Sequence, residues 1–189
     1  MIIYDDLLEK KYLMTFCAYK KKISIFLTWV FLFLIIVLIP SCGDKGWFNY
    51  KGLEATHIEV FKSKRILIVY HNDKIIKKYP IDLGFDPKGP KRIEGDGKTP
   101  EGKYIINVHN PNSAFHLSLG VSYPNAKDTA YAKLLGKSPG GEIFIHGQPN
   151  NGKKKKGSDW TAGCIAVKNS HIRQLYSMIK NGTEIYINP

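Results

Sequence analysis

The chain has 189 residues, with 28 Lys and Arg against 16 Asp and Glu, which gives a formal net charge of +12 at pH 7. This length accommodates one domain and a targeting segment rather than two domains, and a hydrophobic content of 43% excludes a disordered chain. The positive charge favours anionic partners such as lipids, wall polymers or acidic peptides. No nucleic-acid-binding motif accompanies the charge, so nucleic acid is not expected as a partner.

The first 42 residues are expected to be a targeting segment. Residues Ile23–Ile39 carry no charge and follow three lysines at Lys20–Lys22, an order typical of an export signal or a signal anchor. Cys42 stands where a bacterial lipoprotein carries its lipid, although Pro40 departs from the usual cleavage box. The alternatives are a lipoprotein, an uncleaved anchor helix or a cleaved soluble form, and Met14 is an alternative start. Each places the rest of the chain on the periplasmic or extracytoplasmic side, and the first two tether it to a membrane.

Residues 43–55 are interpreted as a tether and residues 56–189 as one mostly β domain. Apolar and polar side chains alternate at 57–61, and an apolar run at 65–70 precedes turn residues at 71–73, which predicts a hairpin. Strands are expected at residues 57–61, 65–70, 74–84, 103–110, 115–119, 142–147, 164–167 and 183–189.

Two short helices are expected within this domain. The first spans 128–136, with Asp128 as its cap and Gly136 as its stop, and the second spans 169–180 with apolar residues at helical spacing. Residues 84–102 are too dense in Gly and Pro for a regular element. A long loop of this kind in a compact domain is usually functional or disordered, and here it is interpreted as functional.

One thiol and one imidazole stand out in the expected domain. Cys164 is the only cysteine after the targeting segment, and His146 lies eighteen positions before it. An imidazole can take the proton of a neighbouring thiol and activate it as a nucleophile. Gly163 permits a sharp turn, so the N–H groups of Gly163 and Cys164 are candidate oxyanion donors, and the Gly147 carbonyl is a candidate partner for the second imidazole nitrogen.

The alternative is that Cys164 and His146 are ordinary core residues, since cysteine is among the most buried residue types. A metal site is not expected, because zinc needs three or four ligands at short spacings. The other histidines are scattered, at His57, His71, His109, His116 and His171.

Several segments resemble the catalytic domain of L,D-transpeptidases (YkuD type), a family of bacterial cell-wall enzymes. His146–Gly147, followed after about fifteen residues by Thr161–Cys164, is similar to the motif around that family's nucleophile. The Gly/Pro-rich segment Leu83–Tyr104 and the segments Ser118–Asn125 and Gly140–Gly147 are similar as well. The resemblance covers essentially the whole expected domain.

The resemblance implies a β-rich, sandwich-like fold and a cysteine acyltransferase. Cys164 would be the nucleophile and His146 the general base, while Thr161 and Gly163 would shape the turn and the oxyanion pocket. The partner would be a peptidoglycan stem peptide, from which Cys164 displaces D-alanine before an amine of a neighbouring stem resolves the thioester. Neither a metal nor any other cofactor is implied.

Some positions depart from the family or leave two interpretations open. Many members carry His and Arg where this chain has Ala162 and Ala166, which affects donor anchoring and acceptor choice. Tyr123 is a candidate for the substrate groove, and Trp160 is a candidate for either a wall of the site or an anchor of its loop. The run Lys153–Lys156 either attracts acidic substrate or is a solvated loop.

Other functions remain open at this level. Water instead of an amine would make the same site a hydrolase that trims stem peptides. A chain with an inactive site would be a basic wall-binding module. A redox protein would need a second thiol nearby, and the expected domain has none.

Overall fold

The parts of the chain that the computed structural model describes are Phe26 and residues 28–31, 52–152 and 158–189. The chain divides into two compact units, residues 1–45 and 46–189. The described residues of the first unit are helical, and no helix among the described residues is both long and apolar enough to cross a membrane. The expected anchor at 23–39 lies largely outside the described residues, and Cys42 and the run Lys153–Lys156 lie outside them entirely.

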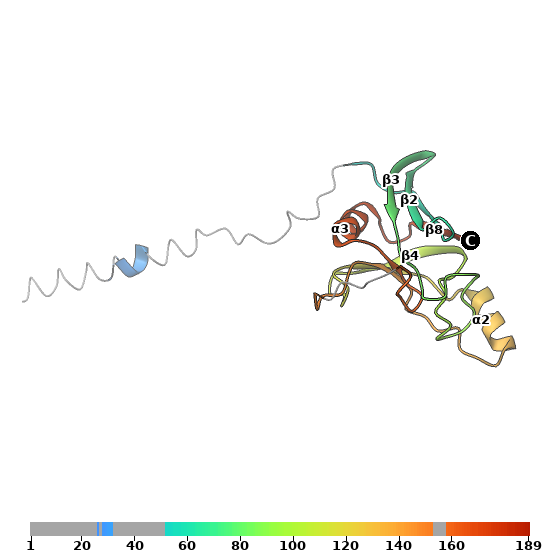
Figure 1. The fold of residues 1–189 in the computed structure, drawn as a ribbon. Coiled ribbons are helices and arrows are strands. Elements are labelled where there is room, and N and C mark those ends of the chain that lie inside the picture. The colour runs from blue at the N-terminus through green and yellow to red at the C-terminus, as the bar shows by residue number, and fades with distance from the viewer. Residues whose placement is uncertain (1–25, 27, 32–51, 153–157) are drawn as a thin grey trace, which may run out of the picture. The chain divides into compact units, whose positions relative to one another are not determined.

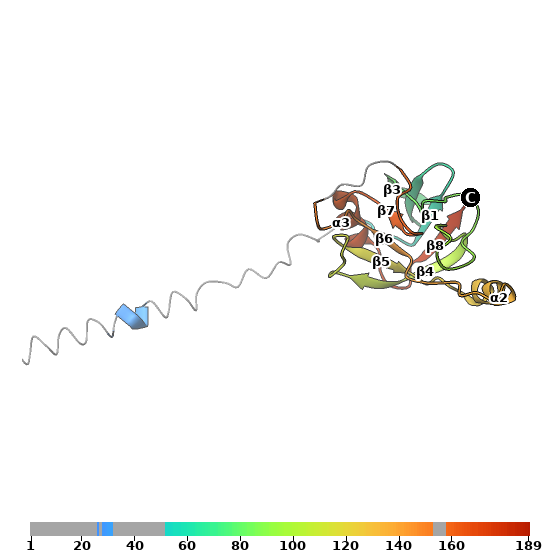
Figure 2. The ribbon, with the colours of Figure 1, turned by 60° about the horizontal axis from the view of Figure 1, so that its bottom comes forward.

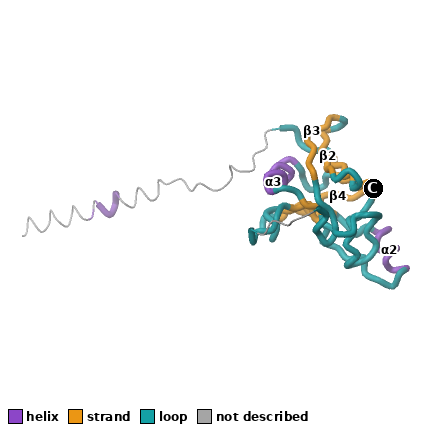
Figure 3. Tube along the Cα trace, in the orientation of Figure 1, coloured by secondary structure: helices purple, strands orange, loops and turns teal. Residues whose placement is uncertain are grey.

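Eight strands of the second unit form one sheet, accompanied by two helices (Figures 1 and 3). The elements are β1 (His57–Phe61), β2 (Ile66–His71), β3 (Lys74–Pro80), β4 (Gly102–Asn110), β5 (Ser118–Val121), α2 (Ala126–Leu134), β6 (Phe144–His146), β7 (Ile165–Ala166), α3 (Asn169–Met178) and β8 (Glu184–Asn188). Across the sheet the order is β3-β2-β1-β8-β4-β5-β6-β7. The pairs β1–β8 and β6–β7 are parallel, and the other neighbours are antiparallel. The expected mostly β domain with two short helices is confirmed.

The two edges of this sheet meet, because the chain that leaves β3 crosses to β7. Asp82 exchanges two backbone hydrogen bonds with Ala166, of 2.9 and 2.8 Å, and Gly84 bridges to Thr161. A Cβ atom at Gly84 would lie 2.0 Å from the Gly97 carbonyl oxygen, so this closure requires a glycine. The sandwich-like domain that the sequence predicts is therefore one curled sheet (Figure 2).

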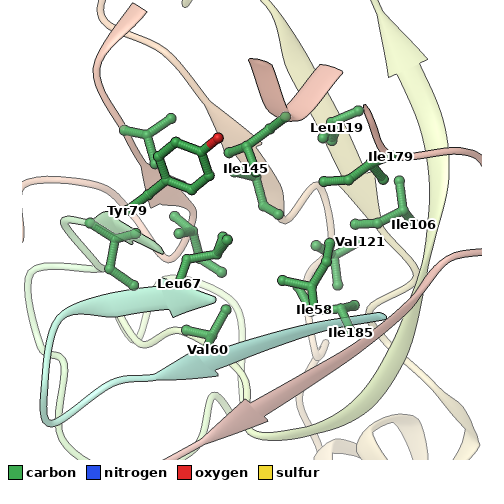
Figure 4. Packing of buried hydrophobic residues seen from close by; sticks show 14 of the residues in the cluster. Ile58, Val60, Leu67, Tyr79, Ile106, Leu119, Val121, Ile145, Ile179 and Ile185 are labelled. Carbon is green, nitrogen blue, oxygen red and sulfur yellow. The ribbon is translucent and has the colours of Figure 1, made fainter. Parts of the chain in front are cut away.

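Apolar side chains from the curled sheet and from α3 form one core inside the curl (Figure 4). Ile172, Leu175 and Met178 are the buried residues of α3, and this helix contacts β5 and β6. Burying one such side chain contributes about 1.5–3 kcal/mol. The core residues labelled in Figure 4 are Ile58, Val60, Leu67, Tyr79, Ile106, Leu119, Val121, Ile145, Ile179 and Ile185. The helix thus supports the strand that carries His146.

Several element boundaries differ from the sequence-based expectations, and β3 ends at Pro80 rather than at residue 84. β5 begins at Ser118 rather than at residue 115, because Ser118 pairs with His146 of β6 and this pairing sets the register. α2 begins at Ala126 and is capped by Asn125, while Asp128 occupies the third helical position of a capping box. α3 ends at Met178, two residues before the expected end.

The Gly/Pro-rich loop is ordered around one largely buried carboxylate, that of Asp96. Asp96 accepts the backbone N–H groups of Arg92 at 2.7 Å and Ile93 at 3.1 Å. It also accepts the N–H of Lys98 at 3.1 Å and the buried ammonium group of Lys91 at 2.9 Å. Burial opposes ionisation of Asp96, but these donors outweigh it, and the pKa of the carboxyl group lies below its usual value.

A second buried charge ties this loop to the end of β1. The ammonium group of Lys62, whose side chain is 2% exposed, donates to the Gly89 and Thr99 carbonyl oxygens at 2.6 and 2.9 Å and to the Glu101 carboxylate at 2.8 Å. These bonds satisfy a charge that burial alone would make unfavourable. The loop is therefore a fixed part of the domain.

Replacing Asp96 by alanine removes the acceptor of all four bonds and leaves the buried Lys91 ammonium without a carboxylate partner, with only its hydrogen bond to the Ile93 carbonyl oxygen. We expect the free energy of unfolding at pH 7 to fall by about 3 kcal/mol, measured by urea denaturation beside Asp73→Ala in an exposed turn. The folded-state pKa of Asp96 is lowered, so its contribution is present above about pH 3.9 and is lost as the pH falls through the folded pKa. The difference from the wild type should shrink over that range. Equal urea midpoints at pH 7 would contradict this account of the loop.

Candidate active site

β6 and β7 bring His146 and Cys164 to the same face of the sheet. The strands are parallel neighbours with Ile145 opposite Ile165, and Cys164 directly precedes β7. Side chains alternate along a strand, so Cys164 faces the same side as Phe144 and His146. The spacing between neighbouring strands and the rise per residue place the Cα atoms of Cys164 and His146 roughly 8 Å apart. At this separation the two side chains can approach each other.

Both side chains line one cavity of about 450 Å³. Its wall combines aromatic rings, small hydroxyl and amide groups, and one carboxylate. The lining residues are Asn110, Ser113, Ala114, Phe115, Ser118, Glu142, Phe144, His146, Trp160, Thr161, Ala162 and Cys164. A cavity of this size accommodates a peptide segment of a few residues or a ligand of similar bulk.

The turn that presents Cys164 depends on Gly163 and Thr161. Gly163 has φ +135°, and a Cβ atom there would lie 2.7 Å from the Lys98 carbonyl oxygen of the Gly/Pro-rich loop. The Thr161 hydroxyl group donates to the Cys164 carbonyl at 2.7 Å and accepts the Gly163 N–H at 3.1 Å. The Gly163 N–H is therefore occupied, in contrast to its expected role as an oxyanion donor. The Cys164 N–H makes no hydrogen bond to another described residue and remains available for that role.

His146 is held by a backbone carbonyl and by aromatic rings. Its ring is 4% exposed, and Nδ1 donates to the Gly147 carbonyl oxygen at 2.7 Å. A carbonyl oxygen only accepts, so Nδ1 carries the proton and Nε2 presents a lone pair. The ring centroids of Phe115 and Trp160 lie 4.5 and 5.6 Å from the centroid of the imidazole ring. Burial lowers the pKa of His146 despite the opposing Gly147 carbonyl, which keeps the imidazole neutral at pH 7.

The Cys164 thiol is also neutral at rest. Burial raises its pKa, and the Glu142 charge acts in the same direction, against the opposing effects of the Phe144 N–H and the Lys91 charge. The Phe144 N–H donates to Sγ at 3.4 Å, and the thiol donates to the Glu142 carbonyl at 3.4 Å. The free site is therefore a thiol beside a base rather than a preformed thiolate–imidazolium pair.

This resting state predicts a specific pH dependence of thiol alkylation. We expect the rate of iodoacetamide modification at Cys164 to keep rising above pH 9, because the pKa of the folded thiol is raised. Mass mapping of the Cys164 peptide separates it from Cys17 and Cys42, and the urea-unfolded chain supplies the unperturbed profile. A rate that is already level between pH 6 and 8 would instead indicate a stabilised thiolate.

The structure brings most of the expected site residues together, with one exception. Tyr123 belongs to the buried core and donates its hydroxyl proton to the Pro139 carbonyl at 3.0 Å, and it does not line the cavity. Trp160 lines the cavity and its indole N–H donates to Asp82 at 3.3 Å, so it serves as both wall and anchor. Ala162 also lines the cavity, whereas Ala166 is fully buried.

Several lining residues were not expected from the sequence, and three of them bear directly on the site. Phe115 lies in the turn before β5 and packs on the imidazole. Ser118 is the cross-strand partner of His146, and it is buried. Glu142 carries the one carboxylate among the described lining residues.

The fold and the cavity together define a β-rich domain whose site is built from one thiol and one neutral imidazole. Among the described residues, no group of three or more His, Cys, Asp or Glu is arranged to hold a metal ion. The family model for the L,D-transpeptidase catalytic domain, YkuD, matches residues 55–187. The chain belongs to this family.

Individual relatives agree with this assignment. YkuD of Bacillus licheniformis is 30% identical over 153 residues, which cover 81% of this chain and 74% of that protein. YafK of Escherichia coli K12 is 27% identical over 129 residues, which cover 65% of this chain and 46% of that protein.

Two solved structures are also similar. Pgp2, a helical cell shape determining protein of Campylobacter jejuni, is 29% identical with a TM-score of 0.56, over 77% of this chain and 51% of its own. Bd1075 of Bdellovibrio bacteriovorus is 30% identical with a TM-score of 0.51, over 74% of this chain and 49% of its own. The chain thus spans about half the length of YafK, Pgp2 and Bd1075.

Proposed function

We propose that this chain is a cysteine-dependent L,D-transpeptidase that transfers an acyl group from a peptidoglycan stem tetrapeptide. The observation that carries the proposal is that Cys164 and His146 line one cavity of about 450 Å³, in a chain of this family. Pgp2, whose name associates it with cell shape, supports a role in the bacterial wall.

In the first step, the thiol of Cys164 attacks the carbonyl carbon of the bond before D-alanine. Nε2 of His146 takes the thiol proton as the S–C bond forms, and the Cys164 N–H stabilises the oxyanion. The C–N bond then breaks, the imidazolium returns the proton to the departing amine, and D-alanine leaves a thioester on Cys164. The lowered pKa of His146 suits it to accept a proton at neutral pH.

In the second step, an amine of a neighbouring stem attacks the thioester. A new C–N bond forms, the C–S bond breaks, and a proton of the amine passes through His146 to the thiolate. The products are an amide between two stems and the free thiol. Water in place of the amine would give a tripeptide and a hydrolase.

The proposal is tested by the intact mass of the full-length chain after incubation with a disaccharide tetrapeptide. We expect an adduct of the donor without its D-alanine, and free D-alanine in solution. Chain that was alkylated beforehand with iodoacetamide should give neither. A crosslinked dimer identifies the transferase and a tripeptide identifies the hydrolase, while no adduct on a folded chain would favour a wall-binding module.

We propose further that the chain is exported and tethered to a membrane. The lysines Lys20–Lys22 followed by the uncharged run Ile23–Ile39 support export and a membrane tether, through that segment or through a lipid on Cys42. Fractionation of cells tests this: the chain should remain with membranes in high salt, and free chain in the medium would contradict the tether.

A further inference from the structure

The cavity has an uneven charge distribution. Among its described lining residues, Glu142 alone carries a full charge at neutral pH, since His146 and Cys164 are neutral there. The other lining groups are aromatic rings, methyl groups, hydroxyl groups and an amide. This part of the cavity therefore favours a cation over an anion.

Glu142 is held next to the nucleophile by its backbone. It has φ +54°, a left-handed conformation that is unfavourable for a residue with a side chain, and two glycines precede it. Its carbonyl oxygen accepts the thiol proton of Cys164 at 3.4 Å. Strain at a position that touches the reacting atom indicates that the position of Glu142 matters to the site.

The carboxylate of Glu142 is not used by the fold. The residue is exposed, and its side chain forms no hydrogen bond or ion pair with another described residue. By contrast, Asp96, Asp159 and Glu101 all bind cationic side chains. The negative charge of Glu142 nevertheless acts electrostatically on the thiol, because it contributes to the raised pKa of Cys164.

We propose that Glu142 forms an ammonium-binding subsite that recruits the amine acceptor and so directs the thioester towards transfer instead of hydrolysis. This inference rests on the proposed function and adds the residue that binds the second substrate. Glu142 and the Cys164 sulfur atom line the same cavity, so an amine bound at Glu142 has access to the thioester carbonyl carbon. The acceptor binds as an ammonium ion and releases one proton to solvent. The resulting amine forms the new C–N bond as the C–S bond breaks, and its second proton reaches the Cys164 thiolate through His146.

The test compares the full-length wild type with Glu142→Gln, which keeps the shape of the side chain and removes its charge. Each is given the disaccharide tetrapeptide as donor, and either a second stem peptide with a free side-chain amine or hydroxylamine, which is uncharged at pH 7. We expect Glu142→Gln to lower the ratio of crosslinked dimer to tripeptide by about tenfold and to leave the reaction with hydroxylamine unchanged. Glu142→Asp should restore part of the ratio. Glu94→Gln, an exposed glutamate outside the cavity lining, should behave as the wild type.

A second readout separates recognition of the amine from damage to the site. The Glu142 charge raises the pKa of the Cys164 thiol, so removing it should move the pH profile of Cys164 alkylation to lower pH. In Glu142→Gln the alkylation rate at a given pH should therefore rise, while the rate of transfer to the amine falls. A general distortion would lower both. Glu142→Gly relieves the backbone strain and should reproduce the loss of transfer in a folded chain.

Each outcome decides the inference. An unchanged ratio of dimer to tripeptide in Glu142→Gln, with normal release of D-alanine, overturns the acceptor subsite and leaves the proposed function standing. Slower release of D-alanine in that variant would show that the carboxylate binds the donor instead, which also overturns it. No acyl adduct on the wild type would overturn the proposed function and the subsite together.

Discussion

Replacing Cys164 by alanine should abolish the acyl adduct and lower the release of D-alanine from a stem tetrapeptide by about 10³-fold or more. The reason is that Cys164 supplies the only sulfur at the cavity among the described residues, and both steps of the proposed reaction pass through its thioester. Intact mass detects the adduct, and chromatography of the soluble products measures D-alanine.

The fold should survive this substitution. The thiol makes two long contacts, with the Phe144 N–H and the Glu142 carbonyl at 3.4 Å each, so we expect a loss of only about 1 kcal/mol in the free energy of unfolding. Cys164→Ser keeps a group of similar shape and should also lose the adduct, because a hydroxyl group is a much poorer nucleophile than a thiolate. Release of D-alanine at the wild-type rate by folded Cys164→Ala would contradict the role of this residue.

Local sequence patterns predicted the elements on which the site is built. The alternation in residues 57–61 corresponds to β1, where Ile58 and Val60 are buried. The glycine at position 163 indicated a sharp turn before Cys164, and its φ of +135° is one that few other residues adopt. These features depend on a few adjacent residues, and that is why the sequence is informative about them.

Features that depend on distant pairing were not predictable. Nothing local indicates that Asp82 meets Ala166 and closes the curl, since 84 positions separate them. Phe115 lies in a turn, and its ring reaches His146 because β5 pairs with β6. Tyr123 shows the opposite case: it lies in a segment that resembles the family, yet its ring packs in the core.

The Glu142 carboxylate and the oxyanion donors illustrate a third limit, because their roles depend on hydrogen-bond partners. The sequence suggested two N–H donors, at Gly163 and Cys164, but the Thr161 hydroxyl group occupies the first. A threonine two residues before a backbone N–H forms such a bond only if the turn has the right geometry. Side-chain chemistry was therefore visible in the sequence, while the availability of each group required the structure.

Replacing His146 by glutamine should slow formation of the acyl-enzyme by about 10²–10⁴-fold while the thiol remains present. Glutamine is similar in size but cannot accept the thiol proton, so attack must wait for the small thiolate fraction of a thiol whose pKa burial has raised. Single-turnover measurements of the adduct by mass spectrometry give the rate. His71→Gln, at a half-buried histidine on β2 that does not line the cavity, is the matched control and should behave as the wild type.

The pH dependence of the same rate distinguishes a general base from a structural histidine. Burial lowers the pKa of His146, so the wild-type rate should fall only at pH values below the usual 6.5, where the imidazole becomes protonated. In His146→Gln this acid limb should disappear, and the remaining rate should rise with pH as the thiol ionises. An acid limb that persists in the variant would assign it to another group. A wild-type rate that falls already between pH 8 and 7 would contradict a lowered pKa at His146, and with it the neutral resting pair on which the mechanism depends.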